Sequence, residues 1–356
     1  MSPTYPEIVR ARLGQQQLSG SPFGGPAALL HWFGAMQAQE YALTKWAIGL
    51  RLPQLVDTQV EAAFTSGEIL RTHLLRPTWH FVSPADIRWM LKLTAPRVQA
   101  GNAYMYRKME LDAGLFPKCN KVIQNLLEGG DQLTRPQIAT VLEERGISAD
   151  GLRLSLIMMQ AELEGLICSG ARKGNQFTYA WLEDRVPIAP DLLGDEALAT
   201  LALRYFTSRG PATILDFSTW SGLSVTDARS AVSMIGSQLT RLQIEGQDYF
   251  CVPSAIIRTQ QAAVAQLLPP YDEYIMGYKN RDAILPRGDA RLKLRFYNMI
   301  IFEGSIVGSW RRTIGNQSVA IDYHFVQSRG KVVRPFRKAA QLFGAFLGLA
   351  VHLNEK

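Results

Sequence analysis

The side chains that most often carry out chemistry are widely spaced in this chain. The five histidines lack the spacing of metal ligands. There is neither a glycine-rich phosphate loop ending in Lys-Ser/Thr nor a Gly-x-Ser-x-Gly nucleophile elbow. The three cysteines, Cys119, Cys168 and Cys251, are odd in number and far apart, which argues against a disulfide framework and a four-cysteine zinc site. We therefore expect no metal, no nucleotide cofactor and a reducing, cytoplasmic location.

The basic residues are concentrated near the C-terminal end. The chain has a net charge of +7, from 38 Lys+Arg and 31 Asp+Glu. Residues 271–356 hold 14 of the basic and 7 of the acidic residues, so the remaining 24 and 24 cancel. A basic segment on a neutral scaffold indicates a polyanionic partner such as nucleic acid, although a solvated basic face would have the same composition. No apolar run reaches the roughly 18 residues of a membrane span, so no membrane partner is expected.

Trp310-Arg311-Arg312 is the most informative string of this basic segment. Guanidinium groups bind phosphates, and an indole can stack on a base or wedge into a duplex. A buried Trp310 is the alternative interpretation. Adjacent positions of a strand face opposite sides, so Arg311 and Arg312 can reach one groove together only if a bulge intervenes.

The elements that must position such residues form a repeated small unit, clearest at residues 118–183. Asn120 is expected to cap its first helix, and Thr134 begins the second with a capping box. After a third helix come two short strands, joined by a polar tip that carries Arg172 and Lys173. Three helices followed by a basic-tipped hairpin are typical of a winged helix. Some winged helices bind duplex DNA, whereas many others serve only to bind proteins.

A second copy of this order is predicted at residues 195–253, where Thr213 and Ser224 are expected to cap two successive helices. The N-terminal region is less regular. Residues 26–45 are predicted as one helix, residues 70–82 as extended chain, and a further helix begins at residue 84 and ends near residue 93. This region is interpreted as a modified winged helix.

The C-terminal region is predicted to contain a three-stranded meander over residues 298–326 and an apolar-faced helix that begins at Pro335. The expected fold class is therefore mainly α with small β-sheets, or α+β. The predicted domains are an N-terminal winged-helix-like unit at 1–117, two winged helices at 118–190 and 191–266, and the basic meander and helix at 267–356.

The sequence resembles the AlkZ-like (YcaQ-related) winged-helix DNA glycosylases over nearly its whole length. The likeness is carried by seven strings in the family's order and spacing: MQAQEYALTKWAIGLR (36–51), LRTHLLRPTWHFVSPADIRWML (70–91), LTRPQIATVLEERGI (133–147), GLICSGARKGNQFTYAWL (165–182), RYFTSRGPATILDFSTWSGLS (204–224), LLPPYDEYIMGYKNR (267–281) and VGSWRRT (307–313). The resemblance implies tandem winged helices around a concave DNA-binding surface. It also implies removal of alkylated purines, including cross-linked ones, by cleavage of the N-glycosidic bond.

One branch of this family carries a catalytic Gln-apolar-Gln string, which Gln37-Ala38-Gln39 matches. Glutamine cannot act as a strong base near pH 7, but its amide oxygen can orient a water molecule. An N7-alkylated guanine is already cationic and leaves as a neutral base, so no strong acid is needed. Without the resemblance, Gln-x-Gln on a helix is an ordinary polar surface, and positions two apart lie about 200° around a helix. Glu40 is an adjacent ionisable alternative.

Other residues follow by position. Thr78 and His80 are expected to line the pocket, and a hydrogen-bonded, partly buried role is the alternative for His80. Arg311, Arg312, Arg172, Lys173, Arg281 and Trp310 are the predicted contacts to double-stranded DNA. Asp272 and Glu273 are placed either near the DNA or in pairs with Lys279 or Arg281.

The predicted function is that of a monomeric, nucleoid-associated DNA glycosylase. It is expected to be monofunctional, because no lysine for a Schiff base lies inside the glutamine string. Cross-linked guanine is a possible substrate, and either base flipping or an open groove would suit the sequence. A non-catalytic winged-helix regulator of DNA would explain the fold and the basic tail equally well.

Overall fold

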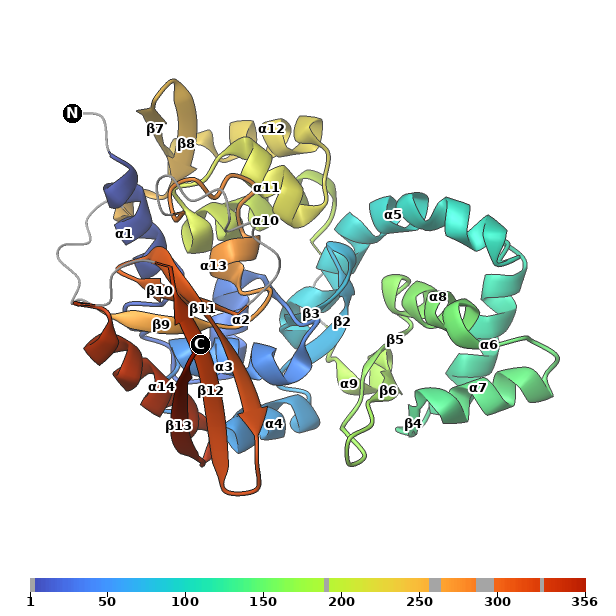
Figure 1. Ribbon diagram of the computed structural model, residues 1–356. Helices are drawn as coiled ribbons and strands as arrows, with labels where there is room; N and C mark the ends of the chain where they lie inside the picture. Colours follow the sequence, from blue (N-terminus) through green and yellow to red (C-terminus); the bar gives the residue numbers. More distant parts are fainter. Residues whose placement is uncertain (1–3, 189–191, 256–263, 286–297, 327–329) are drawn as a thin grey trace.

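The structure is a computed structural model of the 356-residue chain that describes residues 4–188, 192–255, 264–285, 298–326 and 330–356. The described residues form fourteen α-helices and thirteen strands, and the strands make four sheets. The expected mixture of helices and small sheets is therefore confirmed. In Figure 1, a large body holds both the first and the last of the labelled elements, α1 and β13, and a smaller lobe is joined to it by the long helix α5 (Pro84–Lys108). Within the described ranges, no helix has the length and apolar character needed to cross a membrane.

The first unit lies at the centre of the body. Its elements are α2 (Pro26–Phe33), β1 (Ala35–Gln37), α3 (Tyr41–Arg51), α4 (Asp57–Ser66), β2 (Leu70–Leu74) and β3 (Arg76–Val82). The strands are antiparallel in the order β1-β3-β2. The last strand of the unit therefore lies between the first two.

The smaller lobe holds the second unit. Its elements are α6 (Leu115–Leu127), β4 (Gln132–Thr134), α7 (Arg135–Glu144), α8 (Gly151–Leu163), β5 (Ile167–Ser169), β6 (Thr178–Trp181) and α9 (Leu182–Arg185). The sheet order is β4-β6-β5. The last strand again lies in the middle.

The third unit packs at the top of the body in Figure 1. Its elements are α10 (Gly194–Arg209), α11 (Ile214–Ser221), α12 (Val225–Met234), η1 (Gly236–Gln238), β7 (Thr240–Ile244), β8 (Gln247–Cys251) and η2 (Pro253–Ala255). β8 pairs with β7 and, through an isolated bridge at Phe250, with Ala212. All three units thus share one order of helix, extended segment, two helices and hairpin.

The helix starts predicted at Thr134, Thr213 and Ser224 are confirmed, and each of these residues forms a capping box, which had been predicted for Thr134. The cap predicted at Asn120 is wrong, since that residue lies inside α6. The helix predicted to end near residue 93 is also wrong, because α5 continues to Lys108 and connects the body to the lobe.

The single helix predicted over residues 26–45 is wrong, and this correction concerns the glutamine string. Helix α2 ends at Phe33, and Gly34 takes a positive φ of 75° that favours glycine. The chain then enters β1, where Ala35 pairs with Val82 of β3. Strand pairing with a segment more than 40 residues away replaces the helix that the local pattern favours.

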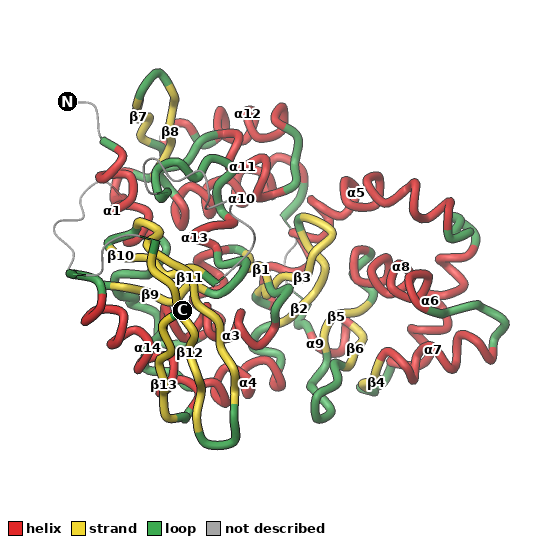
Figure 2. Tube along the Cα trace, in the orientation of Figure 1, coloured by secondary structure: helices red, strands yellow, loops and turns green. Residues whose placement is uncertain are grey.

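The C-terminal region forms a five-stranded sheet in the order β13-β12-β11-β10-β9, seen in front of α3 in Figure 2. Its elements, with the helices beside it, are β9 (Ala265–Leu268), α13 (Glu273–Met276), β10 (Met299–Phe302), β11 (Ser305–Ile314), β12 (Ser318–Phe325), α14 (Val333–Leu347) and β13 (Ala350–Glu355). The N-terminal helix is α1 (Tyr5–Gln15). The predicted meander corresponds to β10, β11 and β12, whereas the two outer strands were not predicted.

Two of the three predicted domain limits fall inside elements of secondary structure. The limit at 117/118 lies inside α6, and the limit at 266/267 lies inside β9, which belongs to the C-terminal sheet. The limit at 190/191 lies outside the described residues.

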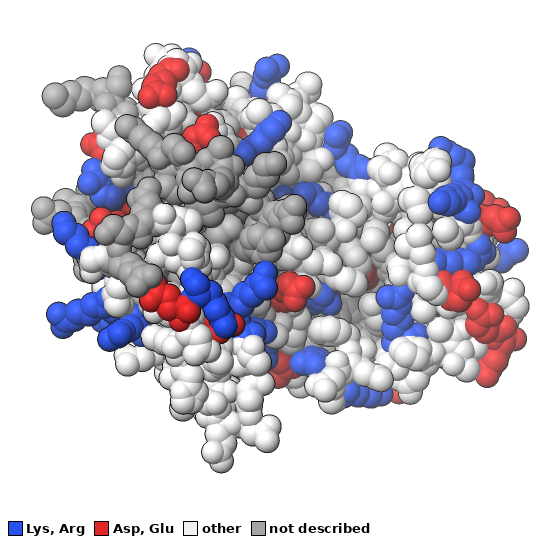
Figure 3. Space-filling view, in the orientation of Figure 1, with Lys and Arg blue, Asp and Glu red and all other residues white. Residues whose placement is uncertain are grey.

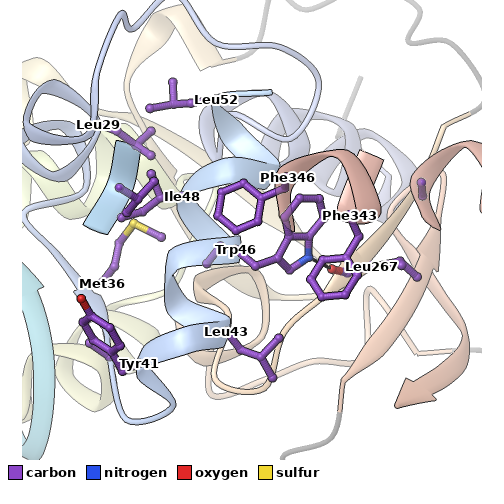
Figure 4. Packing of buried hydrophobic residues seen from close by; sticks show 14 of the residues in the cluster. Leu29, Met36, Tyr41, Leu43, Trp46, Ile48, Leu52, Leu267, Phe343 and Phe346 are labelled. Carbon is purple, nitrogen blue, oxygen red and sulfur yellow. Dashed lines mark hydrogen bonds between the residues drawn. The ribbon is translucent and has the colours of Figure 1, made fainter. Parts of the chain in front are cut away.

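An aromatic cluster attaches the C-terminal sheet to the first unit, as Figure 4 shows for part of it. The ring centroid of Trp46 in α3 lies 5.0 Å from that of Phe343 in α14. The ring centroid of Phe343 lies 5.1 Å from that of Trp310 in β11. The indole nitrogen of Trp46 donates a hydrogen bond of 2.7 Å to the carbonyl oxygen of Leu267 in β9. The helix that follows the glutamine string is therefore packed firmly against the C-terminal sheet.

Candidate active site

The two glutamines lie where a strand gives way to a helix. Gln37 is the last residue of β1 and is 5% exposed, and Gln39 lies between β1 and α3 and is half-buried. The chain is extended at Gln37 rather than helical. The geometry that would have placed the two side chains on opposite sides of a helix therefore does not apply.

The backbone of this short segment is held by buried groups on several sides. The main-chain N–H of Gln37 donates a hydrogen bond of 2.8 Å to Oε1 of Glu273, and the main-chain N–H of Ala38 donates one of 2.7 Å to the carbonyl oxygen of Trp79. The Ala38 carbonyl accepts a bond of 3.0 Å from Nε of Arg71. These bonds fix the direction in which the adjacent side chains leave the backbone.

The two amide side chains have different surroundings. Oε1 of Gln37 accepts a hydrogen bond of 3.1 Å from Nη2 of Arg76. Burial lowers the pKa of Arg76, and the negative charge of Glu273 opposes this shift. Oε1 of Gln39 is enclosed and has no hydrogen-bond partner among the described residues. Of the two side-chain oxygens, that of Gln39 keeps its full capacity to accept.

His80 and Thr78 lie in the sheet beside this segment. His80 is opposite Gln37 in the pairing of β1 with β3 and opposite Thr72 in the pairing of β2 with β3. Residues directly opposite each other share a face of the sheet, so Gln37, His80 and Thr72 form one row. The structure thus brings the predicted pocket residue His80 next to the first glutamine.

The protonation of His80 follows from its contacts. Its Nδ1 lies 2.9 Å from the carbonyl oxygen of Thr78, which can only accept, so Nδ1 carries the proton and Nε2 is a bare acceptor. Burial, with a further contribution from the charge of Arg76, holds the pKa of His80 well below its usual value of 6.5. In the part of the chain that is described, neither Nε2 of His80 nor Oγ1 of Thr78 has a hydrogen-bond partner.

A buried acidic residue that was not predicted to act here completes the surroundings. Oε2 of Glu273 lies 2.6 Å from Nη2 of Arg209, and both side chains are almost fully buried. The predicted pairing of Glu273 with Lys279 or Arg281 is therefore wrong, and Asp272 pairs instead with Arg51. Local sequence carries no signal for these pairs, because the partners come from different units.

Trp310 was predicted to contact DNA, and the structure corrects this prediction in favour of the buried alternative. Its side chain is 2% exposed, and its indole nitrogen donates a hydrogen bond of 2.9 Å to the carbonyl oxygen of Leu268. The ring belongs to the aromatic cluster with Phe343. It therefore stabilises the sheet and has no free face for a base.

Arg311 and Arg312 lie on opposite faces of β11. The pairing of β11 with β12 is regular over these residues, so no bulge brings them together. Arg311 is exposed, while Arg312 is half-buried on the face that carries Trp310. Burial lowers the pKa of Arg312, and the charges of Glu40 and Asp57 oppose this shift. Arg312 is therefore directed toward the side of the hairpin on which the glutamine string lies.

The other predicted DNA contacts differ in availability. The guanidinium of Arg172 lies 5.2 Å above the ring of Tyr41 and 3.7 Å from Oε2 of Glu61, so it joins the lobe to the first unit. Lys173 is exposed, and its Nζ donates a bond of 2.7 Å to the carbonyl oxygen of Gln132. Arg281 is half-buried, and its Nε donates a bond of 3.0 Å to a main-chain oxygen of α13.

Figure 3 shows how charge is distributed on one face of the molecule. Lysine and arginine side chains lie in a band across its middle, and the outline is indented at the lower edge, between the projecting hairpin and the smaller lobe. The tip of the hairpin β11–β12 carries no charged side chain, in agreement with its sequence. The basic groups of the hairpin are thus set back from its tip.

Within the described ranges, no group of three or more His, Cys, Asp or Glu residues is placed so that it could hold a metal ion. Cys119, Cys168 and Cys251 are free thiols and buried. Burial raises the pKa of Cys168 to about 12 and that of Cys251 to about 11, which leaves both thiols protonated.

The fold and this site define a class of protein once they are set beside known families. The family model described as "DNA glycosylase AlkZ-like" matches residues 30–346, which include the three repeated units, apart from the first residues of α2, and most of the C-terminal sheet. The chain therefore belongs to the AlkZ-like family of DNA glycosylases. The resemblance noted from the sequence strings is confirmed.

Among solved structures, the DNA glycosylase AlkZ of Streptomyces sahachiroi is similar to this chain. The two superimpose with a TM-score of 0.78 at 21% sequence identity, over 99% of this chain and 100% of that one. At this identity the likeness shows the fold. A search of the curated proteins found no match.

Proposed function

We propose that this protein is a monofunctional glycosylase that hydrolyses the N-glycosidic bond of cationic N3- or N7-alkylated purines in duplex DNA, with a water molecule oriented by Gln37 and Gln39. The observation that carries the proposal is the state of the glutamine segment. Its backbone is fixed by buried hydrogen bonds, and it presents an enclosed amide oxygen, Oε1 of Gln39, that is free to accept. A fixed acceptor next to a reacting carbon is what orientation of water requires.

The surrounding groups support a cationic leaving base. His80 is held neutral, so it is a poor source of a proton for a leaving group that would otherwise depart as an anion. Glu273 is fully engaged by Arg209 and the Gln37 amide. A base that already carries a positive charge needs neither a strong acid nor a strong base, which fits a site built on neutral amides.

The ion pairs of Lys45 support hydrolysis without a lyase step. Its ammonium group lies 2.8 Å from Oδ2 of Asp57 and 2.7 Å from Oε2 of Glu61, and its side chain is 6% exposed. An ammonium group engaged by two carboxylates is not available as a nucleophile for a Schiff base. Lys45, the lysine closest in sequence to the glutamine string, is therefore occupied elsewhere.

We further propose that the three repeated units are winged helices that bind DNA together with the C-terminal hairpin. The shared element order and the central position of the last strand support this. Arg312, Lys173 and Arg281 are the favoured phosphate contacts. Arg172 contributes through the junction of the lobe with the first unit, and Arg311 lies on the outer face of the hairpin.

The test is excision from duplexes that contain either N7-methylguanine or uracil, read as alkali-labile abasic sites. We expect release of N7-methylguanine at a rate at least about 100-fold above that of uracil, since uracil must leave as an anion. Gln37→Ala and Gln39→Ala are each expected to lower the single-turnover rate by about 100-fold or more with unchanged duplex affinity.

Gln54→Ala is the matched control, because Gln54 is exposed in the loop between α3 and α4 and should not affect the rate. Full activity of the Gln37, Gln39 double variant would rule out the proposed role of the amides. Equal release of the two bases would rule out the preference for cationic lesions. Tight duplex binding without any excision would favour a non-catalytic DNA-binding protein.

A further inference from the structure

We propose that Glu273 and Arg209 are positioning residues for the reaction: they hold the main chain of Gln37 and thereby set where its side-chain amide lies. This inference rests on the proposed function, because it concerns the same site. Neither residue needs to touch the substrate. Their effect is exerted through the segment that joins α2 to β1.

The carboxylate of Glu273 divides its two oxygens between different tasks. Oε1 accepts a hydrogen bond of 2.8 Å from the main-chain N–H of Gln37. Oε2 accepts from Nε and Nη2 of Arg209, at 3.1 and 2.6 Å, and from the indole nitrogen of Trp220 at 3.0 Å. Glu273 is the first residue of the short helix α13, so the C-terminal region places this carboxylate against a strand of the first unit.

Arg209 holds the same segment from its other side. As the last residue of α10, it donates from Nη1 to the carbonyl oxygen of Phe33 at 2.8 Å and from Nη2 to that of Ala35 at 2.9 Å. Those two carbonyls lie on either side of Gly34, where the chain turns from α2 into β1. The ion pair therefore fixes both the turn and the strand that ends at Gln37.

The geometry around the guanidinium leaves it little freedom. It stacks over the ring of Trp220 at 4.2 Å and that of Phe33 at 5.0 Å. A Cβ at Gly277 would approach Cδ of Arg209 to 3.2 Å and the carbonyl oxygen of Glu273 to 2.7 Å, so the glycine leaves room for the pair. A fully buried ion pair is weak evidence of net stability, because desolvation offsets its attraction. Its hydrogen bonds to the segment give it a defined positional effect instead.

Replacing the carboxylate by an amide should disturb this arrangement in a definite way. In Glu273→Gln, the single oxygen is drawn to the donors of Arg209 and Trp220, and the new NH₂ group then faces the Gln37 amide, donor against donor. Glu273→Asp keeps the charge for Arg209 but withdraws the carboxylate by one methylene from Gln37. Both variants should therefore displace Gln37, since a shift of about 1 Å at a reacting group costs on the order of 100-fold in rate.

Asp272→Asn provides a matched control. Asp272 is the adjacent residue, is equally buried, and pairs with Arg51 through contacts of 2.8 Å, but it makes no hydrogen bond to Gln37. Its loss removes a buried carboxylate and disturbs an arginine in the same region. A purely structural contribution of Glu273 would be reproduced by this control.

The experiment measures the single-turnover rate of N7-methylguanine release, the Kd for undamaged duplex, and the hydrogen-exchange protection of the Gln37 amide. For Glu273→Gln and Glu273→Asp we expect rates at least about 30-fold below that of Asp272→Asn, with Kd within about twofold and lost protection of the Gln37 amide. Glu273→Asp serves where Glu273→Gln does not fold. Rates equal to that of Asp272→Asn in an active protein would overturn this inference alone. An inactive wild type would overturn the proposed function and this inference with it.

Discussion

His80 is an uncharged base in the middle of the first unit's sheet, and its titration links the site to stability. Its pKa in the folded state lies well below the usual 6.5 because it is buried and near Arg76. As the pH falls below about 6.5, the unfolded chain binds a proton that the folded chain does not. The stability associated with this histidine is therefore complete at pH 8 and is lost progressively as the pH falls below about 6.5.

We accordingly expect the free energy of unfolding of His80→Asn to depend less on pH than that of the wild type between pH 8 and pH 5.5. Asparagine keeps a donor for the Thr78 carbonyl but does not titrate. Urea unfolding at the two pH values measures the difference. His352→Asn, at an exposed position of β13, should keep the wild-type dependence. An unchanged pH dependence in His80→Asn would show that the folded protein protonates His80 normally.

The sequence identifies some of these residues and not others, for a physical reason. Gln37 and Gln39 were predicted through resemblance to a family, and their chemistry was deduced from the amide group itself. His80 was predicted from its position in the same N-terminal unit. Glu273 was placed either near the DNA or in a pair with Lys279 or Arg281, and its contact with Gln37 was not predicted, because it joins residues 236 positions apart. A single sequence does not encode such a contact in any local pattern.

Among the elements, prediction succeeded where the signal is short-range. The helix starts at Thr213 and Ser224 depend on caps between residues three positions apart and were predicted correctly. Strand β1 depends on pairing with β3 and was predicted as helix. Strand β13, which runs parallel to β12 after α14, was missed for the same reason. The glutamine string therefore lies in the element that local sequence predicted least well.

The strand β11 allows a test of the revised role of Trp310. In Trp310→Phe, the buried carbonyl oxygen of Leu268 loses its donor, and the smaller ring packs less well against Phe343. We expect a loss of about 1–3 kcal/mol in the free energy of unfolding, with duplex affinity unchanged at a temperature where the variant is folded. Urea unfolding and fluorescence anisotropy of labelled duplex measure the two effects. A stable variant with weakened DNA binding would restore Trp310 as a DNA contact.

At the scale of the whole molecule, the structure shows on which faces some of the basic side chains of the C-terminal region lie. Five of its basic residues, at positions 287, 291, 293, 295 and 329, lie outside the described residues. Of the two arginines of the hairpin, Arg312 faces the side on which the glutamine string lies, and Arg311 is on the opposite face. A duplex whose lesion reaches Gln37 and Gln39 must then lie along the face of Arg312.

This placement predicts unequal effects of the two arginines on salt dependence. Each phosphate contact contributes a slope of about 0.9 to the fall of log K with log salt concentration in duplex DNA. We expect Arg312→Ala to reduce the slope by about that amount and Arg311→Ala to reduce it by much less, with the fold of both variants intact because neither side chain is in the core. Titrations of undamaged duplex between about 50 and 200 mM salt give the slopes. A larger reduction for Arg311→Ala would place the DNA on the outer face of the hairpin, away from the glutamines, and the proposed path of the duplex would be wrong.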